Sequence, residues 1–345
     1  MEQAERKTDL NAICIAACFG AIYNHVFGYR FFDAPGLGGP AAQFAFFVSK
    51  LAAPLFFMIS GALLLEREDS YKKAFARILR MGVVLILMCA FYALVHCLET
   101  GEPFDIVRFI QTIYRDAPQN TNVFPLLYCY LGVLVMLPVL QRLAGGLKRK
   151  DFLYFLLIAA FWSGCMPIVR HLWPGLPGNP HLDLSVFSFC LAMPLTGLYI
   201  ERHTVLSRGG MRLAACGALL FTACSVALTR LDPNAYANGR LFYDNCAYLP
   251  TMAAAACVFY LYGWMHMRVR AGARLRRGAA ALGRLTLCVY LFSDFFIRLL
   301  EPARAFLTQS DASYAGTLLY ALAVYACGAL LAAALTRVPG LKKLL

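Results

Sequence analysis

The stretch PLFFMISGALLLEREDSYKKAFARILR, residues 54–80, decides how this chain is read. Its first half extends the apolar run 44–53, and its second half carries Lys73, Arg77 and Arg80 at helical spacing. A run of about 20 apolar residues is long enough to cross the hydrocarbon core of a bilayer as a helix. The stretch therefore predicts a membrane helix, followed by a basic segment at the membrane surface that leads into the next one.

Arg77 and Arg80 lie one turn apart and so share a helix face. Two guanidinium groups on one face are suited to phosphate, because each presents a fork of N–H donors. The alternative interpretation is that they are flanking charges that only set the topology, since positive residues concentrate on the cytoplasmic side of membrane proteins.

Composition places the whole chain in the membrane class. Of its 345 residues 60% are hydrophobic and 15% charged, far from the values of ordinary soluble domains. The net charge of +13 lies between apolar spans, where it sets topology and meets anionic lipid, and we expect no nucleic-acid partner. The 13 cysteines include no C-x-x-C pair; they are expected to be buried apolar residues, and no metal site is expected.

Counting apolar runs predicts an all-α, polytopic bundle of ten transmembrane helices in a single domain, residues 1–345. The runs that begin at 123, 182 and 285 contain proline or charge and are expected to be broken or misplaced. The predicted spans are 10–28, 41–65, 80–98, 123–141, 152–169, 182–200, 212–229, 246–267, 285–300 and 314–336.

The distribution of positive charge predicts the orientation. With the N-terminus inside, the inner segments hold 23 of the 32 Lys and Arg residues and the outer segments and helix ends hold 8. Both termini are therefore expected in the cytoplasm. Lys50 is the remaining one and lies within a predicted span.

The outer segments differ from the inner segments in amino-acid composition. Segments 35–40, 99–122, 173–183 and 232–244 are rich in Gly, Pro, Asn, Asp and aromatic residues. They are expected to form a cleft that binds a hydroxyl-rich ligand and is lined by His96, His171 and His181. The alternative is that these segments are turns with interfacial aromatic residues.

His25 is the candidate catalytic residue. It follows Leu10 by 15 residues, so at about 1.5 Å per residue it lies in the outer half of the first helix. Histidine accepts a proton near neutral pH, which a general base for acyl transfer to a hydroxyl must do. The alternative is a hydrogen bond between helices.

Taken together, these features resemble the acyltransferase 3 family of integral-membrane O-acyltransferases, from Asp9 to about Leu300. The segments that carry the resemblance are His25 late in the first helix, PLFFMISGALLL (54–65), ARILR (76–80), FPLLYCYLGVLVMLPVL (124–140) and LGRLTLCVYLF (282–292).

The resemblance implies a bundle of about ten helices in the bacterial cytoplasmic membrane. Such proteins move an acyl group, usually acetyl, from cytoplasmic acyl-CoA to a hydroxyl of a sugar or cell-envelope glycan on the outer face. It implies that His25 is catalytic and that Arg77 and Arg80 hold the phosphates of CoA; Lys73 in the same basic segment is expected to help. The expected partners are membrane lipid, acyl-CoA and a carbohydrate acceptor.

The chain departs from the family pattern at Cys14, where the family usually has Arg, at Val123 and Pro125, where it has His-x-Trp, and at Ser293, where it often has His. Two other functions stay open: a transporter of glycan or lipid-linked substrate, and a non-catalytic relative that acts as a membrane scaffold. A transporter would favour inverted repeats, and none is visible.

Overall fold

The computed structural model describes residues 2–33, 39–115, 121–175, 188–237, 240–269, 272–307 and 314–344, and most of them are helical. The elements are α1 (Glu2–Asp33), α2 (Pro40–Lys50), α3 (Ala52–Leu64), α4 (Tyr71–Thr100), α5 (Ile106–Arg115), α6 (Phe124–Gly146), α7 (Arg149–Ala159), the π-helix η1 (Ala160–Cys165), α8 (Met166–Leu172), α9 (Phe189–His203), α10 (Arg208–Leu231), β1 (Tyr236–Ala237), β2 (Arg240–Leu241), α11 (Leu249–Arg268), α12 (Ala273–Gly283), α13 (Thr286–Leu291), α14 (Ser293–Leu299), α15 (Glu301–Leu307), α16 (Tyr314–Leu335) and α17 (Pro339–Leu344).

The prediction of a polytopic helical membrane protein is confirmed. Large apolar side chains such as Phe75, Leu98 and Leu330 are exposed, as expected where a helix faces lipid rather than water. A helix lies in each of the ten predicted ranges, but the number ten and the cytoplasmic termini stay predictions. Within the described residues, six segments are long and apolar enough to cross a membrane: Pro40–Leu64, Tyr71–Thr100, Phe124–Gly146, Arg149–Leu172, Arg208–Leu231 and Gly316–Leu335.

The chain forms two compact units. The first unit comprises residues 1–68 and 139–283, and the second comprises residues 69–138 and 284–345. The boundary inside α6 falls at Pro138, and α6 runs through this proline without interruption. The span predicted at 123–141, which was expected to be broken or misplaced, is therefore one continuous helix.

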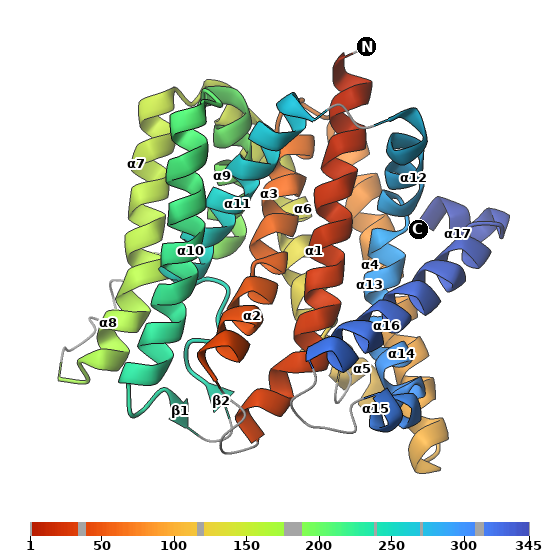
Figure 1. The fold of residues 1–345 in the computed structure, drawn as a ribbon. Helices are drawn as coiled ribbons and strands as arrows, with labels where there is room; N and C mark the ends of the chain where they lie inside the picture. Colours follow the sequence, from red (N-terminus) through yellow and green to blue (C-terminus); the bar gives the residue numbers. More distant parts are fainter. Residues whose placement is uncertain are drawn as a thin grey trace. The chain divides into compact units, whose positions relative to one another are not determined.

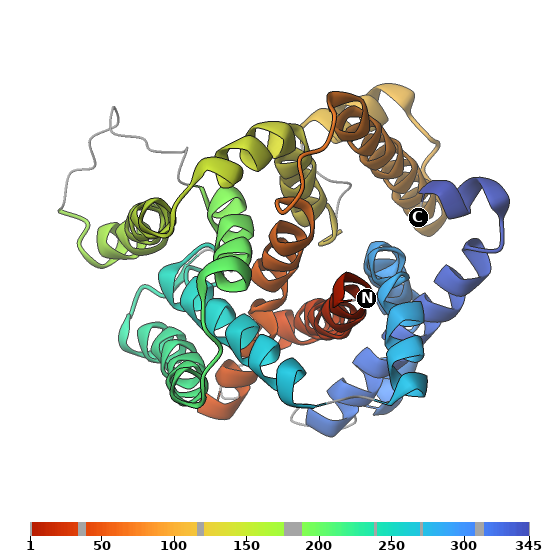
Figure 2. The same cartoon turned by 90° about the horizontal axis from the view of Figure 1, so that it is seen from above.

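In the first unit, α3 lies between α1 and α9 (Figures 1 and 2). The span that α2 and α3 form together is 67% buried, whereas the other five candidate spans are 22–39% buried. The uncharged half of the stretch 54–80 is therefore a central helix, which explains why it is apolar on every side.

Two glycines bring α3 and α9 into direct backbone contact. A Cβ atom on Gly61 of α3 would lie 2.0 Å from the carbonyl oxygen of Pro194 in α9. A Cβ atom on Gly197 of α9 would lie 2.1 Å from the carbonyl oxygen of Met58 in α3. Each helix thus supplies the glycine that accommodates the other helix's backbone, the small-residue packing typical of membrane helices.

Pro54 accounts for the interruption between α2 and α3. Proline donates no backbone hydrogen bond, and its ring clashes with the carbonyl four residues earlier, which here belongs to Lys50. The helix accordingly breaks at Leu51, and Leu55 N–H bonds to the Leu51 carbonyl at 3.0 Å as the next helix begins.

Pro167 explains the π-helix η1 in the same way. Its ring would clash with the carbonyl of Ser163 in a regular α-helix, and the wider turn of η1 directly precedes it. A Cβ on Gly164 in this turn would lie 3.0 Å from Leu249 Cα, so the turn also lets α11 approach closely.

Helices α10 and α11 pack side by side and are joined by the short hairpin of β1 and β2 (Figure 1). The hairpin is held by an apolar cluster that includes Phe46 and Phe47 of α2, Ile168 of α8, and Tyr243 and Tyr248. Tyr23 of α1 packs against the same cluster. This end of the first unit is therefore a packed layer rather than a set of free loops.

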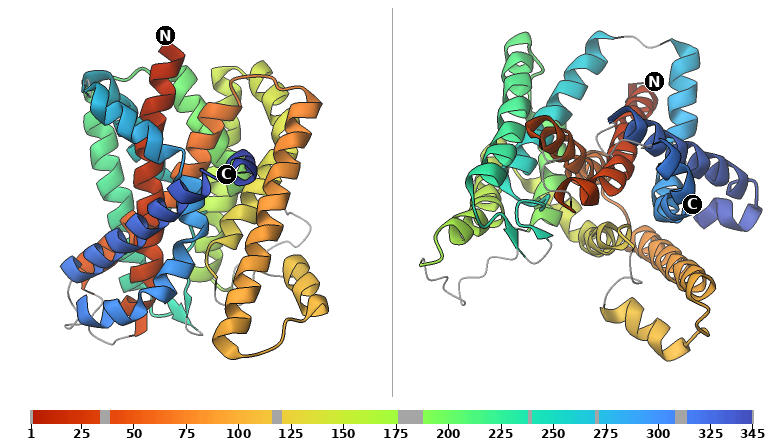
Figure 3. Two further views of the ribbon diagram at one scale, coloured as in Figure 1. Left: turned by 90° about the vertical axis from the view of Figure 1, so that its right-hand side faces the viewer. Right: turned by 60° about the horizontal axis from the view of Figure 1, so that its bottom comes forward.

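The second unit contains α4, α5, most of α6 and α13–α17. Figure 3 shows α5 folded back beside the end of α4, and α16 beside the short helices α13–α15. The predicted span 285–300 is broken between α13 and α14 at Phe292, which confirms that expectation. The hydroxyl of Tyr92 in α4 donates to the Leu291 carbonyl at the break, at 2.8 Å, so a freed carbonyl is satisfied.

Gly61→Ala should destabilise the protein. A methyl group 2.0 Å from a carbonyl oxygen forces α3 and α9 apart, and overpacking of this kind costs about 1–3 kcal/mol. Thermal unfolding of the purified protein measures the effect. Gly132→Ala is the matched control, because this glycine of α6 has open space around it and alanine favours a helix. Equal midpoints for the two variants would contradict the packing argument.

Candidate functional site

His25 is positioned by contacts of the residues around it on α1. Ile22 and Val26 are buried, and the side-chain amide of Asn24 donates to Ser49 Oγ in α2 at 2.9 Å. Ser49 Oγ in turn donates to the Phe46 carbonyl at 2.6 Å. These bonds determine how α1 is rotated against α2. The His25 ring is partly buried, with its Nδ1 atom shielded from solvent.

Lys73, Arg77 and Arg80 share one face of α4, since they are spaced four and three residues apart. Lys73 and Arg80 are exposed, and Arg77 is partly exposed. Arg77 forms an ion pair with Asp69, which lies just before the helix and is mostly buried. The structure thus brings the three predicted phosphate-binding residues together, and adds a carboxylate that competes for one of them. His25 lies in the other unit.

Two positions that depart from the family pattern meet in one network in the second unit. Tyr290 of α13 donates from its hydroxyl to the Val123 carbonyl at 3.3 Å, and Ser293 Oγ donates to the Tyr290 carbonyl at 2.7 Å. Both Val123 and Ser293 are buried. Here Ser293 satisfies backbone at the break between α13 and α14.

The other two departures have different surroundings. Cys14 is a partly buried residue of α1, one turn before the buried Cys18. Pro125 is the second residue of α6, a position where proline costs no helix hydrogen bond because the first N–H groups have no partner within the helix.

A cluster of titratable groups lies beside the hairpin of the first unit. Asp232, which ends α10, holds His171 Nε2 at 2.7 Å and the Tyr243 hydroxyl at 2.9 Å on one oxygen, and the Asn234 N–H at 2.8 Å on the other. An ionised carboxylate only accepts, so Nε2 is the donor. The His171 ring stacks on Phe242, with centroids 3.6 Å apart.

Burial acts to raise the pKa of Asp232, but the hydrogen bonds from Asn234, Tyr243 and His171 outweigh it, so this pKa lies below its ordinary value. Burial and the neighbouring carboxylate together raise the pKa of Tyr243. Asp232 therefore stays ionised and Tyr243 stays protonated at neutral pH.

Lys50, the charge within a predicted span, also has a partner. It forms an ion pair with Asp244 from the segment after β2, and its ammonium group lies 5.2 Å from the centroid of the Phe46 ring. Burial raises the pKa of Asp244 although Lys50 acts to lower it.

No sequence motif marks Asp69, Asp232 or Asp244, although these carboxylates hold Arg77, His171 and Lys50. Asp232 and Asp244 are far from their partners in sequence, and no spacing rule connects them. The signal that was available is the Asp-Pro-Asn turn at 232–234, where Asp232 accepts the N–H two residues on, as aspartate does in turns.

Of the three histidines expected to line one cleft, His171 lies in this cluster and His96 lines a pocket in the second unit. His181 lies outside the described residues. Three charged residues near the end of the predicted span 285–300 are also held by partners: Arg298 pairs with Glu99 at 3.1 Å, Glu301 with Arg304 at 2.6 Å, and Asp294 accepts the Asn122 N–H.

The fold is that of a helical membrane protein, and a comparison with known families identifies the family to which the chain belongs. A family model described as an acyltransferase domain, that of acyltransferase 3, matches residues 8–337. The chain belongs to this acyltransferase family. No curated protein and no solved structure matches it.

Asp232→Asn should lower stability by about 1–3 kcal/mol at neutral pH, because His171 and Tyr243 lose a charged acceptor. The pKa of Asp232 is depressed from 3.8 in the folded protein, so its contribution is present above that pH and is lost as the pH falls below it. The gap between wild type and variant in thermal midpoint should therefore shrink below about pH 4.

The control is Glu99→Gln, which removes an exposed carboxylate from an ion pair with Arg298. Exposed pairs contribute about 0–1 kcal/mol, so this variant should change the midpoint little. A pH-independent gap for Asp232→Asn would contradict the assignment of an ionised carboxylate.

Proposed function

We propose that the protein is an O-acyltransferase of the bacterial cytoplasmic membrane that moves an acyl group, acetyl in the first instance, from cytoplasmic acyl-CoA to a hydroxyl of a sugar or cell-envelope glycan on the outer face. The observation that carries the proposal is the family match over residues 8–337, which includes both His25 and the basic face of α4. Membership of the family supports acyl transfer. The donor, the acceptor and the direction of transfer are proposed here.

In the proposed reaction His25 is the general base. It takes the proton of the acceptor hydroxyl while the hydroxyl oxygen attacks the thioester carbonyl carbon. The C–S bond breaks as the new C–O ester bond forms, and the proton held by His25 passes to the departing thiolate. The products are the acylated sugar and CoA–SH, and no metal or redox step is needed.

The position of His25 supports this role. Its ring is partly buried on a helix whose rotation is held by the Asn24–Ser49 hydrogen bond. This hydrogen bond holds the part of α1 that carries His25, and a base within reach of a bound hydroxyl contributes about 10²–10⁴-fold to the rate.

The basic face of α4 supports the donor assignment. CoA carries several phosphate groups, and Lys73, Arg77 and Arg80 offer three cationic groups on one helix face. On the predicted orientation this face lies at the cytoplasmic end of α4, where acyl-CoA is available. Asp69 pairs with Arg77, and a phosphate would compete with Asp69 for this guanidinium.

The proposal is tested by acyl-CoA binding and turnover with the purified protein. Arg77→Ala combined with Arg80→Ala should weaken acyl-CoA binding about 100-fold, because each lost charge-assisted bond is worth about tenfold. His25→Ala should leave binding unchanged and reduce turnover at least about 100-fold. Binding is measured by calorimetry and turnover by release of CoA–SH.

Two controls make the result specific. Arg208→Ala combined with Arg212→Ala removes the same charge from an exposed pair at the start of α10 and should not affect binding. His266→Ala removes an exposed histidine of α11 and should not affect turnover. If wild-type protein does not bind acyl-CoA, the transferase proposal is wrong and transport or scaffolding replaces it.

Asp69→Asn should tighten acyl-CoA binding several-fold, because Arg77 is released and a negative charge is removed from the neighbourhood of the phosphates. Glu68→Gln, next in sequence and exposed, removes the same charge without touching Arg77 and is the control. Weaker binding by Asp69→Asn would show instead that Asp69 holds Arg77 in its binding position.

A further inference from the structure

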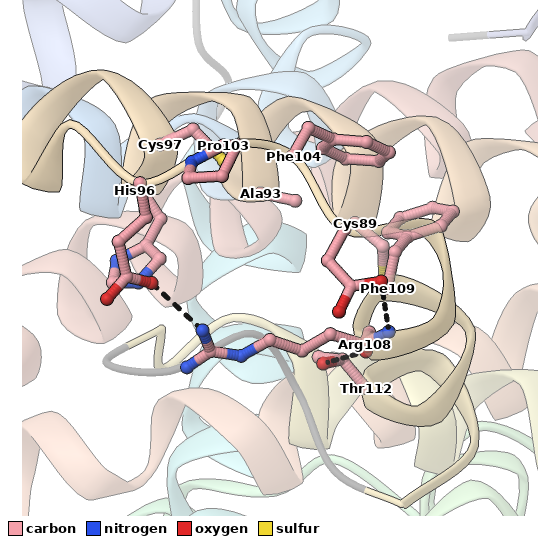
Figure 4. A pocket seen from close by; sticks show the side chains of 11 residues that line it. Cys89, Ala93, His96, Cys97, Pro103, Phe104, Arg108, Phe109 and Thr112 are labelled. Atoms are coloured by element: carbon pink, nitrogen blue, oxygen red, sulfur yellow. Dashed lines mark hydrogen bonds and ion pairs between the residues drawn. The ribbon is translucent and has the colours of Figure 1, made fainter.

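A pocket lies between the last turns of α4 and the short helix α5 in the second unit (Figure 4). Helix α4 ends at Gly101, which adopts a positive φ of 73°, a conformation that glycine takes at helix ends. Asp105 then starts α5 by accepting the Val107 N–H at 2.8 Å on its side chain. This turn folds α5 back onto α4 and creates the pocket.

The α4 side of the pocket is formed by small side chains and one histidine. Cys89, Ala93, His96 and Cys97 recur at spacings that place them on one helix face. The His96 ring makes no hydrogen bond to the part of the chain that the structure describes, so both its nitrogens are available to a ligand.

Two aromatic rings form another wall. Phe104 and Phe109 have centroids 5.6 Å apart and planes inclined at 45°, and Phe104 is 44% exposed. In Figure 4 the two rings lie on one side of the pocket and His96 on the other, with the Arg108 side chain extending between them. An exposed aromatic face offers apolar contact to the C–H groups of a ligand.

The charged groups of the pocket have both signs. Arg108 pairs with Glu102 at 2.9 Å, and both side chains are about half exposed. Such an exposed pair is worth no more than about 1 kcal/mol, so a ligand can replace either partner at low cost. Asp105 adds a second carboxylate to the lining.

This mixture selects a class of ligand. Two carboxylates beside a single guanidinium repel phosphate. The charge of Glu102 is offset by Arg108, and that of Asp105 by the N–H groups of Val107 and Arg108, so a cation such as a quaternary ammonium group gains little. A neutral hydroxyl suits both, because it donates to a carboxylate and accepts from a guanidinium. With the exposed aromatic face, the lining matches a neutral sugar ring.

We propose that the pocket between α4 and α5 is a subsite for a neutral, hydroxyl-rich sugar residue, held by Glu102, Arg108 and His96 and stacked on Phe104. The volume of the pocket is about 80 Å³, well below the roughly 300–1,000 Å³ of deep ligand pockets. It therefore holds one sugar residue partly exposed, as an anchoring point of a longer chain.

The place of the pocket along α4 is consistent with the acceptor of the proposed function, on which this inference rests. His96 follows Arg80 by 16 residues on one continuous helix, which corresponds to about 24 Å. If the basic face lies at the cytoplasmic end, the pocket lies at the outer end, where the glycan acceptor is proposed to bind.

The test is sugar binding to the full-length protein in lipid nanodiscs without acyl-CoA. Detergents with sugar headgroups are left out, because they would occupy the pocket. The probes are a panel of neutral mono- and disaccharides, glucose 1-phosphate and choline, followed by saturation-transfer NMR. A soluble disaccharide and its alkyl glycoside in the bilayer distinguish a free glycan from a lipid-linked one.

At least one neutral sugar should bind, and it should bind better than glucose 1-phosphate or choline. Phe104→Ala and Glu102→Gln should each raise its Kd at least about tenfold. The matched controls are Tyr114→Ala, a 90% exposed aromatic residue of α5 outside the pocket, and Gln111→Ala, an exposed polar residue of the same helix. Both should bind like wild type.

The inference is overturned if no neutral sugar binds, if the pocket variants bind as well as the controls, or if phosphate or choline is preferred. Acyl-CoA binding, measured on the same samples, separates this result from the proposed function. Sugar binding without acyl-CoA binding would disprove the transferase and keep the subsite. If the pocket variants turn over acyl-CoA with an unchanged KM for the acceptor, the acceptor binds elsewhere.

Discussion

The first unit depends on a contact between two backbones. Gly61 in α3 lies against the Pro194 carbonyl of α9, and Gly197 in α9 lies against the Met58 carbonyl of α3. Lipid tails are as apolar as leucine, so burial from water does not hold membrane helices together, and close packing through small residues does. This contact holds α3 between α1 and α9, and α1 is the helix that carries His25.

Three basic side chains of the protein are held by carboxylates from outside their own helices. Asp69 holds Arg77, Asp232 holds His171, and Asp244 holds Lys50. A charge surrounded by apolar groups is costly, and pairing with a carboxylate lowers that cost. The same contacts orient basic and imidazole side chains. The ion pairs that stabilise the fold therefore also position groups that can bind a ligand.

Much of the fold was predictable because it depends on local chemistry. A helix lies in each of the predicted spans, and the charged span 285–300 is broken at Phe292, as expected. In contrast, α6 passes through Pro138 without a break. A proline inside a helix removes one hydrogen bond, and whether the helix opens depends on the packing around it, which a single sequence does not contain. The grouping of Lys73, Arg77 and Arg80 was predictable for the same local reason, since it needs only the helical repeat.

By itself the sequence determined the class of protein, the positions of most helices, the family, and the candidate residues on a single helix, because hydropathy and helical spacing act over 20 residues or fewer. Tertiary structure alone decided which carboxylate meets which base, which glycine meets which backbone, and that Phe104, Arg108 and His96 line one pocket. These contacts join residues that turns and helix packing bring together from distant parts of the sequence. The partners are matched by shape and charge, and no periodic sequence pattern reveals such a match.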